Sequence, residues 1–185
     1  SIFFLIGVSL SAPMSQLWPI VFMGTPASAA VSLELLLEGP DPVVGVVTRA
    51  DRPVGRGQRV IPSPVRRVAE THHKPVLAPD RIRDPAFLET LKNWAPQLIV
   101  VVAYGRILPR SILDLPPQGC INVHYSLLPR YRGAAPVQWS LLNGEERSGV
   151  TTMRLVEKMD AGPTLMQEEI SVAPDETTSS LEDKL

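Results

Sequence analysis

Cysteine and histidine are scarce in this sequence. Its 185 residues include one cysteine, Cys120, and three histidines. A single cysteine excludes an internal disulfide framework and a cysteine-rich zinc site, and so few histidines argue against a multi-histidine metal centre, so we expect no metal. A chain without disulfides fits a reducing, cytoplasmic compartment. Cys120 lies within an apolar run, so we expect it to be a small buried residue and not a nucleophile.

The sequence also lacks an excess of charge of one sign and a long hydrophobic run. A formal net charge of −1 gives no overall attraction to nucleic acid or to an anionic membrane, so such a contact needs a local basic patch. The apolar run from Ile2 to Val8 is too short to span a bilayer, and no Lys or Arg precedes it as in a secretory signal. We expect no membrane partner, and we interpret residues 1–13 as an extraneous or disordered preamble before Met14.

Several motifs of nucleotide-binding proteins and hydrolases are missing. The segment MGTPASAA after the first apolar run is not G-x-G-x-x-G, and no acidic residue closes the next apolar run where a ribose would be held. The chain has neither a P-loop nor a G-x-S-x-G nucleophile elbow. These absences disfavour a dinucleotide-binding protein and serine-based covalent catalysis.

The sequence does contain a regular alternation of strand-like and helix-like segments. Apolar or alternating runs predict strands at 19–24, 43–48, 97–104, 120–124, 149–156 and 164–172. Proline near the start and glycine near the end predict helices, which we place at 26–39, 63–72, 85–95 and 134–144. Residues 49–62 predict a long surface loop. The order indicates an α/β fold, a Rossmann-like, open, mostly parallel twisted sheet with helices on both faces.

The chain length is that of one domain, which we place at 14–185. Ligands of such sheets bind beyond the carboxyl ends of the strands. The strand CINVH ends there with Asn122 and His124, whose equal parity directs both side chains to one face. Asp160, in KMDAG, follows the next predicted strand.

These three residue types suit acyl transfer to an amine without a covalent intermediate. Asn122 can donate a hydrogen bond to a carbonyl oxygen that becomes an oxyanion. His124 can be charged to stabilise that oxygen, or it can move a proton. Asp160 can hold the charge of the histidine and take the proton of the amine, directly or through a water. The pattern therefore predicts Asn122, His124 and Asp160 as catalytic residues.

A family resemblance sharpens this prediction. The segment SLLPRYRGAAP (126–136), with NVH before it and GVT…MDAGP after it, resembles the folate-dependent formyltransferases, and the likeness extends from Ile20 to Leu185. FMGTP (22–26) and DRPVGRG (51–57) are similar to the members that formylate methionyl-tRNA. The resemblance implies transfer of the formyl group of 10-formyltetrahydrofolate to the α-amine of initiator methionyl-tRNA, by direct attack through a tetrahedral intermediate. It assigns the catalytic roles to the same Asn, His and Asp.

The resemblance also implies two binding regions. Folate contacts are expected at Arg106, Ile107, Leu108, Val156 and Glu157, and at Ser126, Leu127, Leu128 and Pro129, which otherwise only shape the turn. Contacts with tRNA are expected at the arginines of the basic loop and of the RYR segment, which are Arg49, Arg52, Arg56, Arg59, Arg130 and Arg132. Loop arginines are also commonly solvated charges, and the last two can instead cap helix ends or pair with carboxylates.

Some features depart from the family pattern and keep alternatives open. Ala27-Ser28-Ala29 replaces a segment of D-F-A type, and Arg106 stands where the tRNA enzymes often carry an aliphatic residue. Those enzymes continue into a C-terminal β-barrel that binds tRNA, so we interpret 14–185 as a catalytic domain truncated at its C-terminal end. We expect it to be a monomer. One alternative is a formyltransferase acting on an amino sugar nucleotide, which QWSLLNGE (138–145) also resembles. Another is a non-catalytic remnant that binds folate or tRNA.

Overall fold

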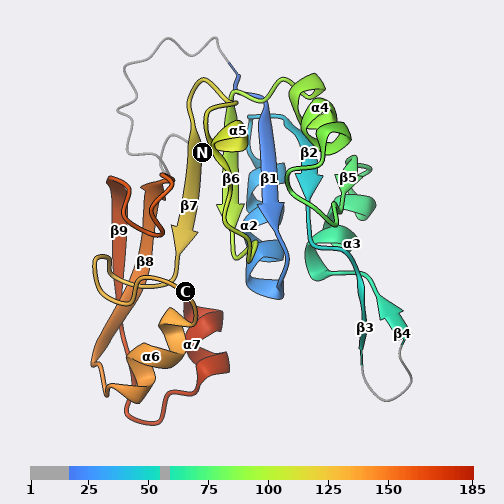
Figure 1. Ribbon diagram of the computed structural model, residues 1–185. Coiled ribbons are helices and arrows are strands. Elements are labelled where there is room, and N and C mark those ends of the chain that lie inside the picture. Colours follow the sequence, from blue (N-terminus) through green and yellow to red (C-terminus); the bar gives the residue numbers. More distant parts are fainter. Residues whose placement is uncertain (1–16, 55–58) are drawn as a thin grey trace.

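A computed structural model describes residues 17–54 and 59–185, so the interpretation of residues 1–13 and the role of Arg56 concern residues outside the described part. Seven strands form one sheet in the order β5-β2-β1-β6-β7-β8-β9 (Figure 1). These strands are β1 (Ile20–Gly24), β2 (Val43–Val47), β5 (Val76–Leu77), β6 (Leu98–Val102), β7 (Cys120–His124), β8 (Arg147–Arg154) and β9 (Thr164–Ser171).

The sheet is parallel from β5 to β7 and antiparallel at β8 and β9. Every residue of β1 and β6 is buried, which is why their sequences IVFMG and LIVVV are continuous apolar runs without a polar face. The expected open, mostly parallel sheet is confirmed.

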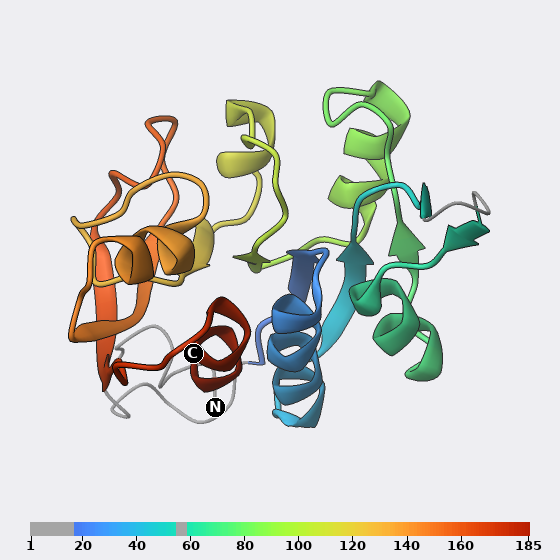
Figure 2. The same cartoon turned by 90° about the horizontal axis from the view of Figure 1, so that it is seen from below.

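Within residues 17–54 and 59–185, six helices accompany the sheet. They are α2 (Ala27–Glu38), α3 (Pro64–Thr71), α4 (Pro85–Asn93), α5 (Arg110–Leu113), α6 (Pro136–Leu142) and α7 (Thr178–Lys184). Alternation along β1 directs Ile20 and Phe22 to the core beneath α2 and α3, and Val21 and Met23 to the core beneath α4 and α5. Figure 2 shows α2 and α4 on opposite sides of the sheet, as the predicted helices on both faces require.

The prediction of an irregular loop at 49–62 is wrong in part. Strands β3 (Arg52–Val54) and β4 (Arg59–Ile61) pair antiparallel as a two-stranded ribbon separate from the main sheet. Three residues on each side are too few to show an alternating pattern, and a proline within β3 argued against a strand.

Two further elements were not predicted, and one is longer than expected. β5 has two residues and α5 has four, so neither is long enough for a recognisable period. The segment LEDKL (181–185) predicts the start of a helix, but α7 begins already at Thr178, because Thr177 and Ser180 form a reciprocal capping box. These elements depend on pairing at the sheet edge or on a cap, not on a hydrophobic pattern.

Candidate functional site

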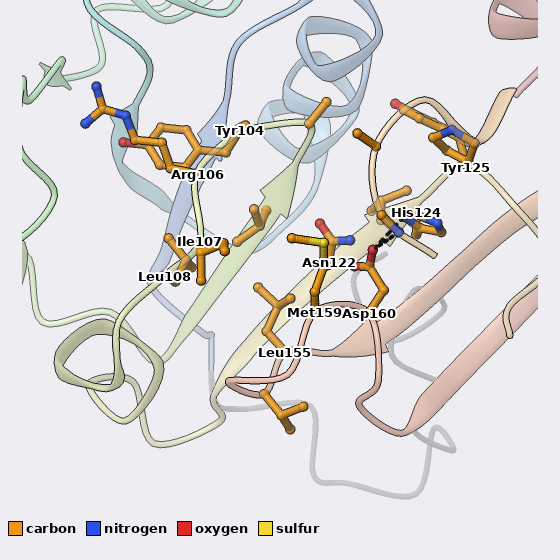
Figure 3. A pocket seen from close by; sticks show the side chains of 18 of the residues that line it. Tyr104, Arg106, Ile107, Leu108, Asn122, His124, Tyr125, Leu155, Met159 and Asp160 are labelled. Carbon is orange, nitrogen blue, oxygen red and sulfur yellow. Dashed lines mark hydrogen bonds and ion pairs between the residues drawn. The ribbon is translucent and has the colours of Figure 1, made fainter. Parts of the chain in front are cut away.

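A cleft of about 460 Å³ lies at the carboxyl ends of β6 and β7. Its walls come from four segments: the turn after β6, the end of β7, the residues before α6, and the loop between β8 and β9. Figure 3 shows side chains from these segments around one space. The structure thus places a cavity at the sheet edge where the sequence predicted a site.

Asn122 and His124 both line this cleft, as their equal parity on β7 predicts. The His124 ring is buried, with 6% of the residue exposed. Its Nε2 lies 2.9 Å from the carbonyl oxygen of Tyr131, which can only accept, so Nε2 carries a proton. Its Nδ1 lies 3.9 Å from Oδ2 of Asp160 (Figure 3), which is ion-pair range and longer than a hydrogen bond. The three predicted catalytic residues therefore share one cleft.

Asp160 is held in place by the backbone of the segment SLLPRYRG (126–133) after β7, which we call the basic turn. Its Oδ2 accepts a hydrogen bond of 2.7 Å from the amide of Gly133, and its own backbone has a φ of 46°. Gly133 has a φ of 92°, a left-handed conformation that favours glycine. The turn thus contacts His124 through the Tyr131 carbonyl and Asp160 through the Gly133 amide, so its position sets the geometry of both side chains.

The turn is itself tied to the sheet by buried hydrogen bonds. Thr151 Oγ1 on β8 donates to the Ser126 carbonyl over 2.6 Å and accepts from the Leu128 amide over 3.1 Å. Ser126 Oγ donates to the Arg130 carbonyl over 2.7 Å. Four predicted folate contacts therefore lie in the turn outside the lining of the cleft, and they are Ser126, Leu127, Leu128 and Pro129. This placement matches the alternative in which they only shape the turn.

The other five predicted folate residues do line the cleft, and they are Arg106, Ile107, Leu108, Val156 and Glu157. The Arg106 guanidinium is oriented by hydrogen bonds to the carbonyls of Pro79 (3.1 Å) and Asp80 (2.9 Å). Ile107 is 67% exposed at the mouth of the cleft, whereas Leu108 is buried. These residues give one end of the cleft an apolar wall with a fixed cation beside it.

The predicted tRNA-binding arginines are spread over two places. Arg49 is half-buried beside Gly105, a cleft residue. Arg52 and Arg59 lie on the ribbon β3–β4, which extends beyond the carboxyl edge of the sheet on the side away from β9 (Figure 1). In the basic turn, Arg132 is exposed and Arg130 is paired with Glu145. Arg130 thus follows the alternative in which it pairs with a carboxylate.

Sequence reasoning assigned no role to several residues that shape the site. Tyr104 and Tyr125 both line the cleft, and burial raises the pKa of each phenol. The Ser28 and Ser32 side chains of α2 partly offset this rise in the pKa of Tyr125. The aromatic ring just after β7 therefore lies near α2, beside the Ala27-Ser28-Ala29 segment that departs from the family pattern. The backbone contacts of Tyr131 and Gly133 carried no signal in the sequence beyond the turn residues themselves.

Cys120 is buried as expected, because it faces the core on β7 next to α5. Burial raises the pKa of its thiol to about 12. Over residues 17–54 and 59–185, no cluster of three or more His, Cys, Asp or Glu side chains has a metal-binding arrangement. No helix in that part of the chain has the length and apolar character needed to cross a membrane.

The sheet order defines a Rossmann-like α/β protein, and its cleft lies at the carboxyl edge of the sheet, where folds of this class bind their ligands. The chain belongs to the formyl transferase family, whose model matches residues 20–185. It is 56% identical over 166 residues to the methionyl-tRNA formyltransferase of Desulfotalea psychrophila, covering 90% of this chain and 51% of that protein. The corresponding protein of Syntrophus aciditrophicus is 53% identical over 166 residues, covering 90% of this chain and 53% of its own length.

The chain therefore spans about half the length of the curated relatives it matches. Among solved structures, glycinamide ribonucleotide transformylase 1 from Symbiobacterium toebii superposes with a TM-score of 0.76 at 21% identity. That alignment covers 96% of this chain and 84% of the other. At this identity the likeness establishes the fold alone, and it agrees with the strand order described above.

Proposed function

We propose that this chain transfers the formyl group of 10-formyltetrahydrofolate to the α-amine of initiator methionyl-tRNA. The observation that carries the proposal is the meeting of Asn122, His124 and Asp160 in one cleft, with His124 Nδ1 3.9 Å from the Asp160 carboxylate. The names of relatives more than 50% identical support methionyl-tRNA as the acceptor.

The proposed reaction begins with attack of the neutral amine on the formyl carbon. The side-chain amide of Asn122 donates to the oxygen that becomes negative, and His124, which carries a second proton on Nδ1 beside the one on Nε2, supplies a further donor and a positive charge. A well-placed donor of this kind lowers the barrier by about 3 kcal/mol. The new ammonium gives its proton to Asp160, directly or through a water. The bond from carbon to the folate nitrogen then breaks, and that nitrogen takes a proton as tetrahydrofolate leaves.

The two substrates occupy different parts of the site in this proposal. The folate lies against Arg106, Ile107 and Leu108, with Val156 and Glu157 opposite. The acceptor end of tRNA approaches along the basic ribbon, because arginines concentrated at 49–59 in a chain of net charge −1 form a local patch for phosphates. Exposed Arg132 extends this positive character toward His124.

Formyl transfer by this chain to methionyl-tRNA tests the proposal, with the Desulfotalea psychrophila relative as positive control and an amino sugar nucleotide as competing acceptor. His124→Ala should reduce kcat at least a hundredfold and leave folate affinity nearly unchanged, since the imidazole acts on the reacting carbonyl. His72→Ala is the matched control, because His72 is exposed on the end of α3. Transfer to the sugar alone, or folate binding without any transfer, would refute the proposal.

A further inference from the structure

Tyr131 connects the catalytic histidine to a carboxylate outside the cleft. Its backbone carbonyl accepts the hydrogen bond from His124 Nε2, while its hydroxyl donates to Glu145 Oε1 over 2.5 Å. The backbone of Tyr131 is left-handed, with a φ of 56°. Bulky residues adopt this conformation only where surrounding contacts enforce it. The Tyr131 side chain makes contacts of this kind through its hydroxyl, which is bonded to Glu145 and Asn143.

Glu145 is the centre of these contacts. It lies between α6 and β8, and its side chain is 15% exposed. Its carboxylate accepts hydrogen bonds from the Tyr131 hydroxyl and from the Arg130 guanidinium. That guanidinium also lies 5.6 Å from the centre of the Tyr131 ring. Asn143 Nδ2 donates to the same hydroxyl over 3.0 Å. The Tyr131 ring is therefore fixed by a carboxylate and an amide that belong to a different segment from the basic turn.

The orientation of the Tyr131 carbonyl decides which nitrogen of the neutral His124 ring is protonated. A carbonyl accepts only, so it selects the tautomer protonated at Nε2 and leaves Nδ1 directed toward Asp160. If the tyrosine backbone left the left-handed region, the carbonyl would turn away and this selection would be lost. Glu145 does not line the cleft, so it acts on the reaction through the turn that it holds, and Tyr131 is the residue of that turn that contacts His124.

We propose that Glu145 is a positioning residue that fixes the Nε2-protonated tautomer of His124 by anchoring the side chain of Tyr131. The reaction it serves is the proposed formyl transfer, and the inference rests on that function. The tautomer itself is a property of the protein without substrates, so it can be measured independently of any activity. No covalent step is involved.

The test compares Glu145→Ala, Tyr131→Phe and Glu145→Gln. Tyr131→Phe deletes only the hydroxyl, and glutamine keeps an acceptor for that hydroxyl while it removes the charge. The matched control is Glu169→Ala, which breaks an exposed ion pair of 2.5 Å between β9 and Arg147, the first residue of β8. Two quantities are measured: the tautomer of His124 from its imidazole nitrogen NMR shifts, and kcat together with KM for both substrates.

We expect Glu145→Ala and Tyr131→Phe to lower kcat roughly tenfold or more, with KM for folate unchanged, because partners of an active side chain act on its orientation. Both should reduce the population protonated at Nε2, whereas Glu145→Gln recovers most of it and Glu169→Ala changes nothing. Tyr131→Phe carries the test if Glu145→Ala does not fold. An unchanged tautomer in folded Glu145→Ala and Tyr131→Phe overturns the inference. If the unsubstituted chain shows no formyl transfer while the variants shift the tautomer, the proposed function is refuted and the positioning role is supported.

Discussion

Thr151→Val removes the hydroxyl that holds the basic turn to the sheet. Thr151 is fully buried on β8, directly opposite His124 in the strand register. Its Oγ1 donates to the Ser126 carbonyl, accepts from the Leu128 amide, and accepts from Gln167 Nε2 over 2.9 Å. Valine has the same shape, so the substitution deletes these hydrogen bonds without opening a cavity.

The expected loss of stability follows from the backbone groups left unpaired. A buried polar group without its partner costs roughly 1–3 kcal/mol, and the substitution leaves one carbonyl and one amide in that state. The hydrogen bond from Thr151 to the Ser126 carbonyl is buried. The hydrogen bond from the Leu128 amide is only partly buried, so this amide recovers some hydration in the variant. We therefore expect the free energy of unfolding to fall by about 3 kcal/mol, which lowers Tm by roughly 6–12 °C for a chain of this size.

Urea unfolding followed by tryptophan fluorescence measures this change, and an unaltered m value would show that the folded and unfolded states keep their compactness. Thr71→Val is the matched control, because Thr71 is exposed and its hydroxyl bonds to the Arg67 carbonyl within α3. The control should change stability by less than about 0.5 kcal/mol. If Thr151→Val is no more destabilising than Thr71→Val, the buried hydroxyl does not anchor the turn and the reasoning fails.

Three other predictions concern the basic ribbon, the buried thiol and the packing of β2. Arg56→Ala should raise KM for tRNA with little change in kcat. It should also make KM for tRNA depend less steeply on salt concentration, since each lost phosphate contact lowers the slope of affinity against salt. An unchanged KM would identify a solvated side chain. Cys120 should react with a thiol reagent at pH 8 roughly a thousandfold more slowly than in the urea-unfolded chain, because a pKa of about 12 leaves little thiolate. Equal rates would contradict its burial. Gly45→Ala should cost about 1–3 kcal/mol in unfolding experiments, because its Cβ would lie 2.3 Å from the Trp94 ring. Trp94→Leu in the same chain should recover part of that loss, and purely additive effects would exclude this clash.

The sequence was sufficient where one hydrophobic pattern decides the structure. The runs IVFMG and LIVVV predicted central buried strands, because a strand covered on both faces has no polar side. The parity of Asn122 and His124 placed both side chains on one face, because successive side chains of a strand alternate. The sequence was insufficient for β5, α5 and the ribbon β3–β4, which are too short for a period and form through pairing or local hydrogen bonds.

The chain by itself therefore determined which residues bear the candidate chemistry and which edge of the sheet carries them. Only the tertiary structure decided their geometry. The antiparallel turn from β8 to β9 brings Asp160 to 3.9 Å from His124, and the Gly133 amide fixes its carboxylate. The contact of Glu145 with Tyr131 then fixes which nitrogen of His124 is protonated. The Gly133 amide and the Tyr131 carbonyl act as single backbone groups, whose hydrogen-bonding capacity is the same for almost every residue type and leaves no trace in the sequence.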